Sequence, residues 1–128
     1  MAHATAHIAR DRYRTAIVAG GHALTADEPE RLGGADAGAA PYDLLLASLG
    51  ACTAITLRMY ADRKQWPLEE LEVSLHLSGS GPEAFRIERI VTAKGLDDAQ
   101  KARLAEIAER TPVTLTLKGG VGIDTRLA

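Results

Sequence analysis

One uncharged stretch constrains the fold of this chain more than any other feature. Pro41 suits the first turn of a helix and Pro67 cannot continue one, so the two prolines bracket a predicted helix of about 25 residues. Between Leu44 and Leu57 no residue is charged, whichever side of that helix it occupies. A helix lying on a protein surface carries a polar face. We therefore expect this helix to be surrounded by protein on all sides.

Gly50 lies inside the predicted helix, where glycine is less favourable than alanine by roughly 1 kcal/mol. Close approach of another backbone would explain a glycine at this position. We expect a partner helix to cross there.

Two regions have the alternating pattern of half-buried strands. From Ala6 to Ala26 the pattern predicts two or three antiparallel strands, with a turn at Gly20 and Gly21. The glycine-rich segment that follows, "DEPERLGGADAGAAP", is expected to be a loop. The second region alternates strictly after the helix, with four apolar residues on one face: Leu71, Val73, Leu75 and Leu77. "SGSGPE" and "AFRIERIVTAKG" then predict a turn and a second strand, which form an antiparallel hairpin.

The last third of the chain predicts one helix and two short strands. Asp97 is a suitable N-cap for a helix over "LDDAQKARLAEIAERT", and Pro112 is expected to stop it. The tail alternates through Val113, Leu115 and Leu117, which predicts a strand, a turn at Gly119-Gly120 and a short final strand. These elements make an α+β fold, expected to be a single domain over residues 1–128.

The amino-acid composition limits the partners that the chain is expected to bind. The chain is 46% hydrophobic but only 4% aromatic, so its core is thin and pairing with a second copy would bury more apolar surface. The net charge of −2 and the pI near 6.1 favour neither nucleic acid nor an anionic membrane as a partner. The N-terminal residues lack the order of a secretory signal, and the longest apolar stretches fall short of the ~20 residues that span a bilayer. A cytoplasmic protein is expected.

Any redox chemistry depends on one thiol, Cys52, because the chain has no second cysteine with which to form an internal disulfide. A lone cysteine in an apolar helix is most often a packing residue, and reactivity requires a group that stabilises the thiolate. The neighbours of Cys52 in sequence supply no cation. His22 and His76 stand alone in surface contexts, and the four histidines have no zinc-ligand spacing, so no metal or organic cofactor is expected.

Two long stretches of the chain resemble the OsmC/Ohr family, the osmotically inducible protein C and organic hydroperoxide resistance proteins. They are "DEPERLGGADAGAAPYDLLLASLGACTAITLRMYADRKQWPLEELEV" and "LAEIAERTPVTLTLKGGVGIDTRL", in the family's order and at a comparable separation. The resemblance implies an intertwined homodimer, in which antiparallel sheets wrap around a long buried central helix.

The resemblance also implies a site. Cys52 matches the family's peroxidatic cysteine, whose thiolate attacks an organic hydroperoxide and becomes a sulfenic acid. An arginine after the first strand stabilises that thiolate across the subunit interface in the family. Arg10 falls at about that point in this sequence, with Arg12 and Arg14 as alternatives.

Two positions depart from the family pattern. The second cysteine of the family lies in a Cys-Pro-Val segment, and Thr111 of "RTPVTL" stands in its place. The glutamate that orients the arginine is matched by Tyr42, and Asp43 points about 100° away on a helix. The resemblance therefore implies reduction of organic hydroperoxides through Cys52 alone, with an external thiol as reductant. The alternatives are a non-catalytic dimer that binds a small apolar molecule, and a Cys52 that only packs.

Overall fold

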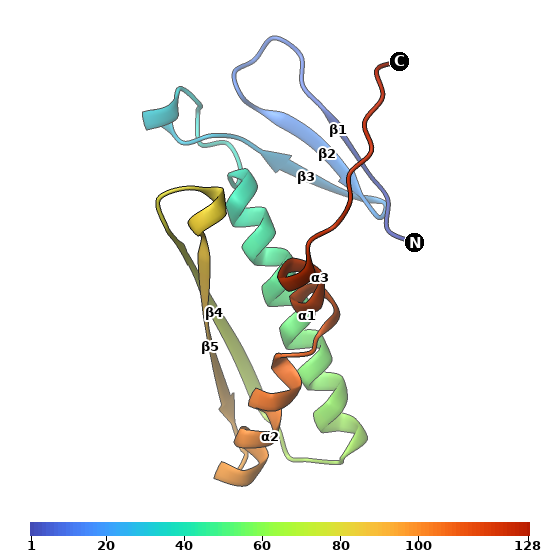
Figure 1. The fold of residues 1–128 in the computed structure, drawn as a ribbon, viewed down its shortest axis with the longest axis vertical. Helices are drawn as coiled ribbons and strands as arrows, with labels where there is room; N and C mark the ends of the chain where they lie inside the picture. Colours follow the sequence, from blue (N-terminus) through green and yellow to red (C-terminus); the bar gives the residue numbers. More distant parts are fainter. The chain divides into compact units, whose positions relative to one another are not determined.

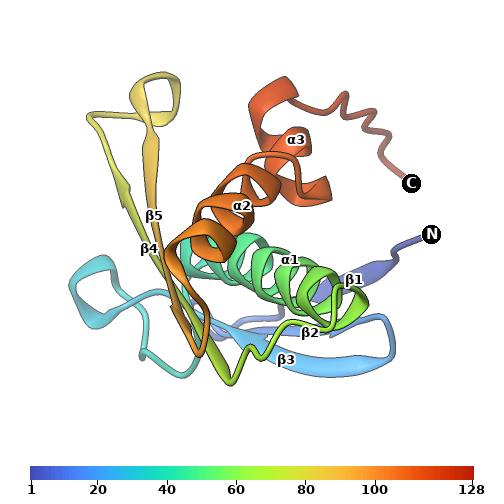
Figure 2. The same cartoon turned by 90° about the horizontal axis from the view of Figure 1, so that it is seen from below.

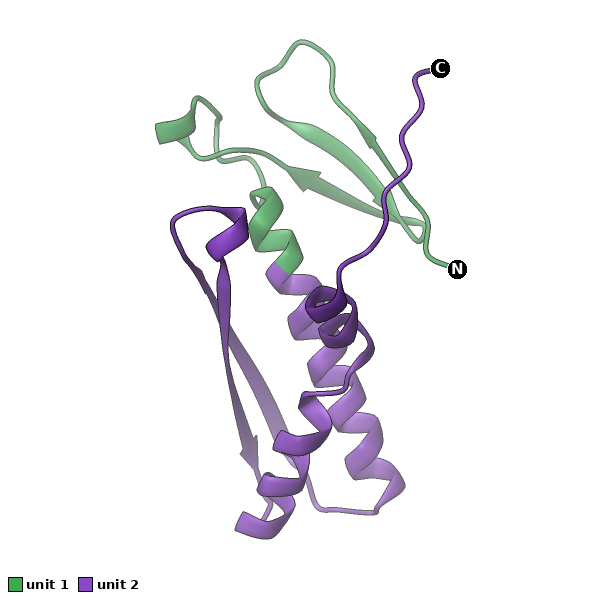
Figure 3. Ribbon diagram, viewed as in Figure 1, with its two compact units in different colours: residues 1–45 green, residues 46–128 purple.

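The computed structural model describes residues 1–128. Two compact units divide the chain, Met1–Leu45 and Leu46–Ala128 (Figure 3). Helix α1, Pro41–Arg63, begins in the first unit and continues through the second, and its bounds agree with those predicted from the two prolines. The organisation of residues 1–128 as a single domain stays a prediction.

The first unit contains a three-stranded antiparallel sheet in the order β1-β2-β3 (Figure 1). Its strands are β1 (Ala4–His7), β2 (Thr15–Ala19) and β3 (His22–Ala26). Ala19 pairs with His22, so Gly20 and Gly21 alone make the turn between β2 and β3, and their φ angles of +57° and +84° suit glycine. The antiparallel strands predicted between Ala6 and Ala26 are confirmed, and β1 begins two residues earlier.

The segment between β3 and α1 is a loop, as predicted, with one 3₁₀ turn at Glu30–Leu32. Asp27 opens this loop and is buried. Its carboxylate accepts hydrogen bonds from four backbone N–H groups, those of Tyr13, Glu28, Ala35 and Ala37, at 2.8 to 3.2 Å. One side chain therefore joins the β1–β2 connection to both ends of the loop.

The second unit contains the predicted hairpin, β4 (Glu70–Ser78) and β5 (Arg86–Lys94), joined through a 3₁₀ turn at Pro82–Ala84. The strands are antiparallel, and Val73 lies opposite Val91. Both strands alternate between half-buried and exposed residues along their whole length. Helices α1 and α2 (Asp98–Ala108) cover one face of this hairpin (Figures 1 and 2).

The core of this unit forms where these elements meet. Leu57 of α1 and Leu104 and Ala108 of α2 are buried together. Trp66 and Val91 are among the half-buried side chains that pack against them. The predicted cap of α2 is confirmed: the Asp97 carboxylate accepts the N–H of Gln100 at 2.8 Å, and the Gln100 side chain accepts the N–H of Asp97 at 3.0 Å.

The strands predicted after Pro112 are wrong. Residues Pro112–Gly119 form helix α3, with Thr111 as the N-cap residue, and no strand follows in residues 120–128. The alternation of Leu115 and Leu117 misled the prediction, because both side chains are exposed. The buried residues are Thr111 and Thr114, three positions apart on one side of the helix. Pro112 thus begins a helix as well as ending the previous segment.

Within one chain the neighbour of Gly50 is a strand and not a crossing helix, and a crossing by a helix of a second chain stays a prediction. The side chain that approaches Gly50 is Leu75 of strand β4, and a Cβ added at Gly50 would lie 2.8 Å from Cδ1 of Leu75. The glycine therefore permits α1 to lie close to the hairpin.

Within one chain, α1 is buried along a single face. Its buried residues follow a four-residue spacing: Leu49, Thr53, Leu57 and Ala61. The opposite side exposes a row of apolar residues, which we call the outer α1 face: Ala47, Ala51, Ile55 and Met59. Enclosure of this helix on all sides stays a prediction, because it requires a second chain.

Helix α1 corrects one expectation, that no apolar stretch of the chain is long enough to span a bilayer. By length and composition alone this helix of 23 residues is able to cross a membrane. The central helix of a soluble protein has the same length and composition, so this property does not separate a membrane-spanning helix from a core helix.

Candidate functional site

Cys52 lies in the middle of α1, one residue before the fully buried Thr53, and its free thiol is half-buried. The N–H of Val113 donates a hydrogen bond to its sulfur, with the nitrogen 3.4 Å from Sγ. This contact joins residues 61 positions apart in the chain. The first turn of α3 therefore lies against the middle of α1 (Figure 1).

The N–H of Val113 is free to bind the sulfur because of its place in α3. The first N–H groups of a helix have no acceptor within the helix, and Pro112 before it has no N–H. The N-terminal end of a helix carries a partial positive charge, which interacts favourably with an anion. This arrangement can stabilise a thiolate at Cys52 without any cationic side chain adjacent in sequence.

Arg89 of strand β5 holds the two helices beside this contact. Its Nη1 donates to Oγ1 of Thr53 at 3.0 Å and to Oγ1 of Thr114 at 2.8 Å. Its Nη2 donates to the carbonyl of Ala108, the last residue of α2, at 2.9 Å. One guanidinium thus connects α1, α2 and α3.

Thr111 lies at the start of α3 and is buried, with 1% of its surface exposed. Its hydroxyl oxygen is 2.6 Å from that of Thr114 and 3.4 Å from the carbonyl of Ala108. Thr111 is also two residues before Val113, whose N–H contacts the thiol. The residue in the place of the family's second cysteine therefore belongs to the hydrogen-bonded cluster beside Cys52.

The far end of α3 is held to α2 by an ion pair. Lys118 Nζ lies 2.6 Å from a carboxylate oxygen of Glu109. Lys118 lowers the pKa of Glu109 from its ordinary value, through this hydrogen bond and through its charge, and the charge of Arg89 contributes in the same direction. Both ends of α3 are thus fixed to the end of α2.

A hollow of about 570 Å³ adjoins the cluster. Its walls are mixed, with four apolar side chains and five polar or charged ones: Leu49, Phe85, Ile87 and Leu117, and Arg86, Arg89, Glu109, Thr114 and Lys118. Cys52 is not among the residues that line it. Within one chain the hollow therefore lies beside the site and does not lead to the thiol.

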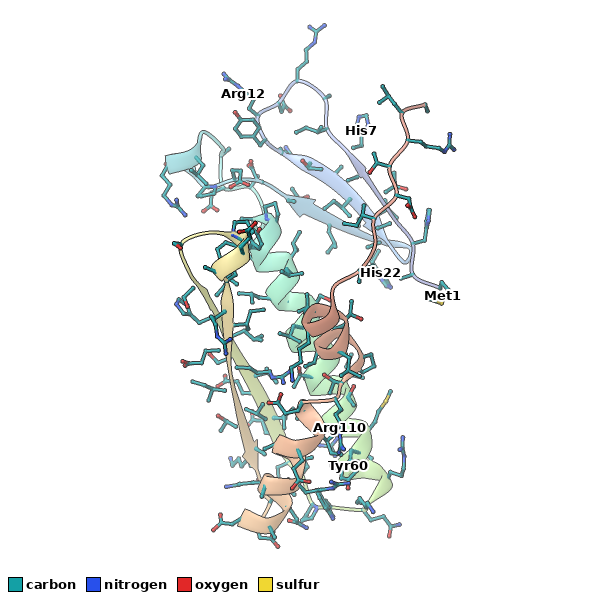
Figure 4. All side chains as sticks on the ribbon, viewed as in Figure 1. Met1, His7, Arg12, His22, Tyr60 and Arg110 are labelled. Carbon is teal, nitrogen blue, oxygen red and sulfur yellow. The ribbon has the colours of Figure 1, made fainter.

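The predicted partners of Cys52 from the N-terminal region lie in the other unit. Arg10, Arg12 and Arg14 are exposed in the connection between β1 and β2, where Figure 4 labels Arg12. Cys52 belongs to the second unit, so the pairing of Arg10 with Cys52 stays a prediction.

Tyr42 and Asp43 occupy the first turn of α1. Tyr42 is 47% exposed. The Asp43 carboxylate accepts a hydrogen bond from the N–H of Ala40 at 3.1 Å and so serves the start of the helix. That Asp43 does not replace the family's glutamate stays a prediction.

His22 and His76 are exposed on strands β3 and β4, in the surface positions predicted for them. The structure gathers no group of three or more histidine, cysteine or acidic side chains that could hold a metal ion.

Two residues with structural roles, Arg89 and Asp27, were not predicted from the sequence. Arg89 occupies a half-buried, inward position of β5, between Ile87 and Val91, and a cation in the inward register of an amphipathic strand is the signal that marks it. Asp27 is the other. The N–H groups of Ala37, Glu28, Tyr13 and Ala35 hold the pKa of its carboxyl below the ordinary value of 3.8, against the opposing effect of burial. Its signal is an aspartate at the start of a glycine-rich loop.

The fold and the site define an α+β protein whose single cysteine lies on the long helix α1 and contacts the N-terminal end of helix α3. The profile of the family described as OsmC-like protein matches residues 33–126, most of the chain. The chain therefore belongs to the OsmC-like family, and the resemblance found in its sequence is confirmed.

Solved structures of the same fold agree with this assignment. An OsmC-like protein from Mycoplasma pneumoniae has a TM-score of 0.74 at 19% identity, over 93% of this chain and 88% of that one. An organic hydroperoxide resistance protein from Legionella pneumophila has a TM-score of 0.70 at 23% identity, over 93% and 90%. One from Elizabethkingia anophelis has a TM-score of 0.72 at 22% identity, over 93% and 89%. At these identities the likeness shows the fold. No curated protein matches the sequence significantly.

Proposed function

We propose that this protein reduces organic hydroperoxides through Cys52, with an external thiol as reductant. The observation that carries the proposal is the hydrogen bond from the N–H of Val113 at the start of α3 to the sulfur of Cys52. It supplies the anion-stabilising group that a reactive cysteine requires and that the neighbouring sequence lacks. The names of the Legionella and Elizabethkingia proteins support the same substrate class.

In the proposed reaction the Cys52 thiolate attacks the terminal oxygen of the hydroperoxide. An S–O bond forms, the O–O bond breaks, and the leaving alkoxide takes a proton to become an alcohol. The resulting sulfenic acid reacts with an external thiol, which releases water and forms a mixed disulfide. A second external thiol then restores Cys52. Thr111 carries no thiol, so no internal disulfide forms in this cycle.

The proposed active form is a homodimer. The outer α1 face exposes apolar side chains, of which Ile55 and Met59 are 54% and 58% exposed, and a second copy would cover them. In that dimer Arg10 of one chain is proposed to approach Cys52 of the other. Neither a nucleic acid nor a membrane is required, and a cytoplasmic location agrees with the use of a small thiol as reductant.

A second candidate is a non-catalytic dimer that binds a small apolar molecule, with Cys52 a packing residue. The observation that favours it is the hollow beside Arg89, whose mixed walls include the apolar side chains of Leu49, Phe85, Ile87 and Leu117. The loss of both family partners, at Thr111 and Tyr42, points the same way. Binding without turnover would distinguish this candidate from the first.

The deciding experiment compares wild type with Cys52→Ser for consumption of cumene hydroperoxide, with a monothiol or a dithiol as reductant. We expect turnover in the wild type with both reductants and none in the variant. A sulfenic-acid trap followed by mass spectrometry should label Cys52 after one equivalent of peroxide. Background turnover in both proteins, with Cys52 unlabelled, would exclude the enzyme and favour the binding protein.

A further inference from the structure

The contact between Val113 and Cys52 depends on how α3 lies against α1. Its geometry involves one backbone nitrogen and one sulfur, 3.4 Å apart, on two different helices. A small rotation or shift of either helix would lengthen this distance. Some other interaction must therefore set the position of the first turn of α3.

Arg89 provides that interaction at the two neighbouring residues. Thr53 follows Cys52 in α1, Thr114 follows Val113 in α3, and Nη1 of Arg89 donates to both hydroxyl oxygens. The two acceptors are buried, with 0% and 5% of their surface exposed. One nitrogen atom of Arg89 therefore binds both the residue that follows Cys52 and the residue that follows Val113.

The threonine hydroxyls can accept from Arg89 because their protons have other acceptors. Oγ1 of Thr53 donates to the carbonyl of Leu49 at 2.7 Å. Oγ1 of Thr114 shares a hydrogen bond with Thr111 at 2.6 Å. No buried side-chain nitrogen or oxygen in the chain lacks a partner. The cluster is fully satisfied and therefore holds its members in one arrangement.

Arginine suits this position better than lysine. The three acceptors, on Thr53, Thr114 and Ala108, are reached by two nitrogen atoms of one planar group. A lysine ammonium is a single point donor on a flexible stem and does not reproduce this fork.

We propose that Arg89 is a positioning residue for Cys52, which sets the N-terminus of α3 so that the Val113 N–H stabilises the Cys52 thiolate. The inference rests on the proposed function, because it assigns a purpose to a reactive Cys52. It concerns the thiol itself, however, so it can be tested without any hydroperoxide.

The test is the rate at which iodoacetamide alkylates Cys52, followed by mass spectrometry at pH 7 and pH 9 in wild type, Arg89→Met and Arg89→Lys. Cys52 is the only cysteine, so alkylation reports on this site alone. The thiolate is the reacting form. A helix N-terminus stabilises an anion by about 0.3–1 kcal/mol, so the rate at pH 7 should fall about two- to fivefold in both variants. The ratio of the rates at pH 9 and pH 7 should rise.

Arg63→Met is the matched control, since Arg63 is exposed at the end of α1 and the same change there should leave the rates unaltered. Thr114→Val keeps Arg89 and removes one acceptor, so it tests the same link if Arg89→Met does not fold. Thr114→Val should also lower the rate at which Cys52 is alkylated at pH 7.

Unchanged rates and an unchanged ratio in folded Arg89 or Thr114 variants would overturn the inference, even if their melting temperature falls. Slower alkylation in the variants, combined with a wild type that does not consume hydroperoxide, would support the inference and reject the proposed function.

Discussion

Thr111 and Thr114 face each other on the first turn of α3, with their hydroxyl oxygens 2.6 Å apart and both side chains buried. A threonine hydroxyl thus occupies the place where the family carries its second cysteine. Because Thr111 is two residues before Val113, a thiol at this position would lie near Cys52.

The variant Thr111→Cys should therefore form an internal disulfide bond with Cys52. After one equivalent of hydroperoxide, the sulfenic acid at Cys52 should condense with the new thiol and release water. Loss of both free thiols, with a mass lower by two hydrogen atoms than the reduced form, is the expected result. Thr116→Cys, at an exposed position of the same helix, is the control and should not form this bond. Two free thiols remaining in oxidised Thr111→Cys would contradict the placement of Thr111 beside the reactive sulfur.

Ile55→Asp should convert a dimer to a monomer. Ile55 is 54% exposed on the outer α1 face, and a carboxylate there would be buried without a partner in the proposed dimer. Sedimentation velocity at micromolar concentration should give a dimer for the wild type and a monomer for the variant.

Ile90→Asp is the matched control for this change. Ile90 is 55% exposed on the outward face of β5, so its substitution should leave the dimer intact. A wild type that sediments as a monomer would remove the route by which Arg10 is proposed to reach Cys52.

Asp27→Asn should destabilise the loop between β3 and α1 at neutral pH. Both carboxylate oxygens of Asp27 accept two backbone N–H groups each, and an amide NH₂ in either place would face donors instead of acceptors. We expect the melting temperature at pH 7 to fall by about 5 °C. Asp36→Asn, at an exposed position of the same loop, should have little effect.

The contribution of Asp27 should also depend on pH. Its pKa is lower in the folded protein than its ordinary value of 3.8, so its ionised form stabilises the fold above pH 3.8. This stability is lost as the pH falls through the folded pKa. The difference in melting temperature between wild type and Asp27→Asn should therefore narrow below pH 3.8, and a constant difference down to pH 2 would count against the four-donor arrangement.

Gly50→Val should destabilise the second unit. A Cβ at Gly50 would lie 2.8 Å from Cδ1 of Leu75, and a branched side chain would force the strand and helix apart at a cost of about 1–3 kcal/mol. Gly50→Ala should lie within about 1 kcal/mol of wild type, because the gain in helix propensity offsets a shift of the flexible Leu75 side chain.

Urea denaturation of a double-mutant cycle checks this contact. If Leu75 is the obstacle, Leu75→Ala should reduce the effect of Gly50→Val, and the two changes should not be additive. Additive effects would place the obstacle elsewhere.

The amino-acid sequence determined the elements whose signals are local. Pro41 and Pro67 bracket α1, Asp97 and Gln100 cap α2, and the strict alternation of β4 predicted its half-buried face. The sequence also determined the family, because the two stretches around Cys52 and Thr111 are long. Each of these signals is read from residues within a few positions of one another.

Only the tertiary structure decided what Cys52 contacts. The alternation after Pro112 suits a strand equally well, and α3 forms because Thr111 and Thr114 find buried partners on α2 and β5. Arg89 and Val113 reach the site from positions 37 and 61 residues away from Cys52 in sequence. Hydrogen bonds over such separations depend on distances of about 3 Å between packed elements, and no local pattern of residues encodes those distances.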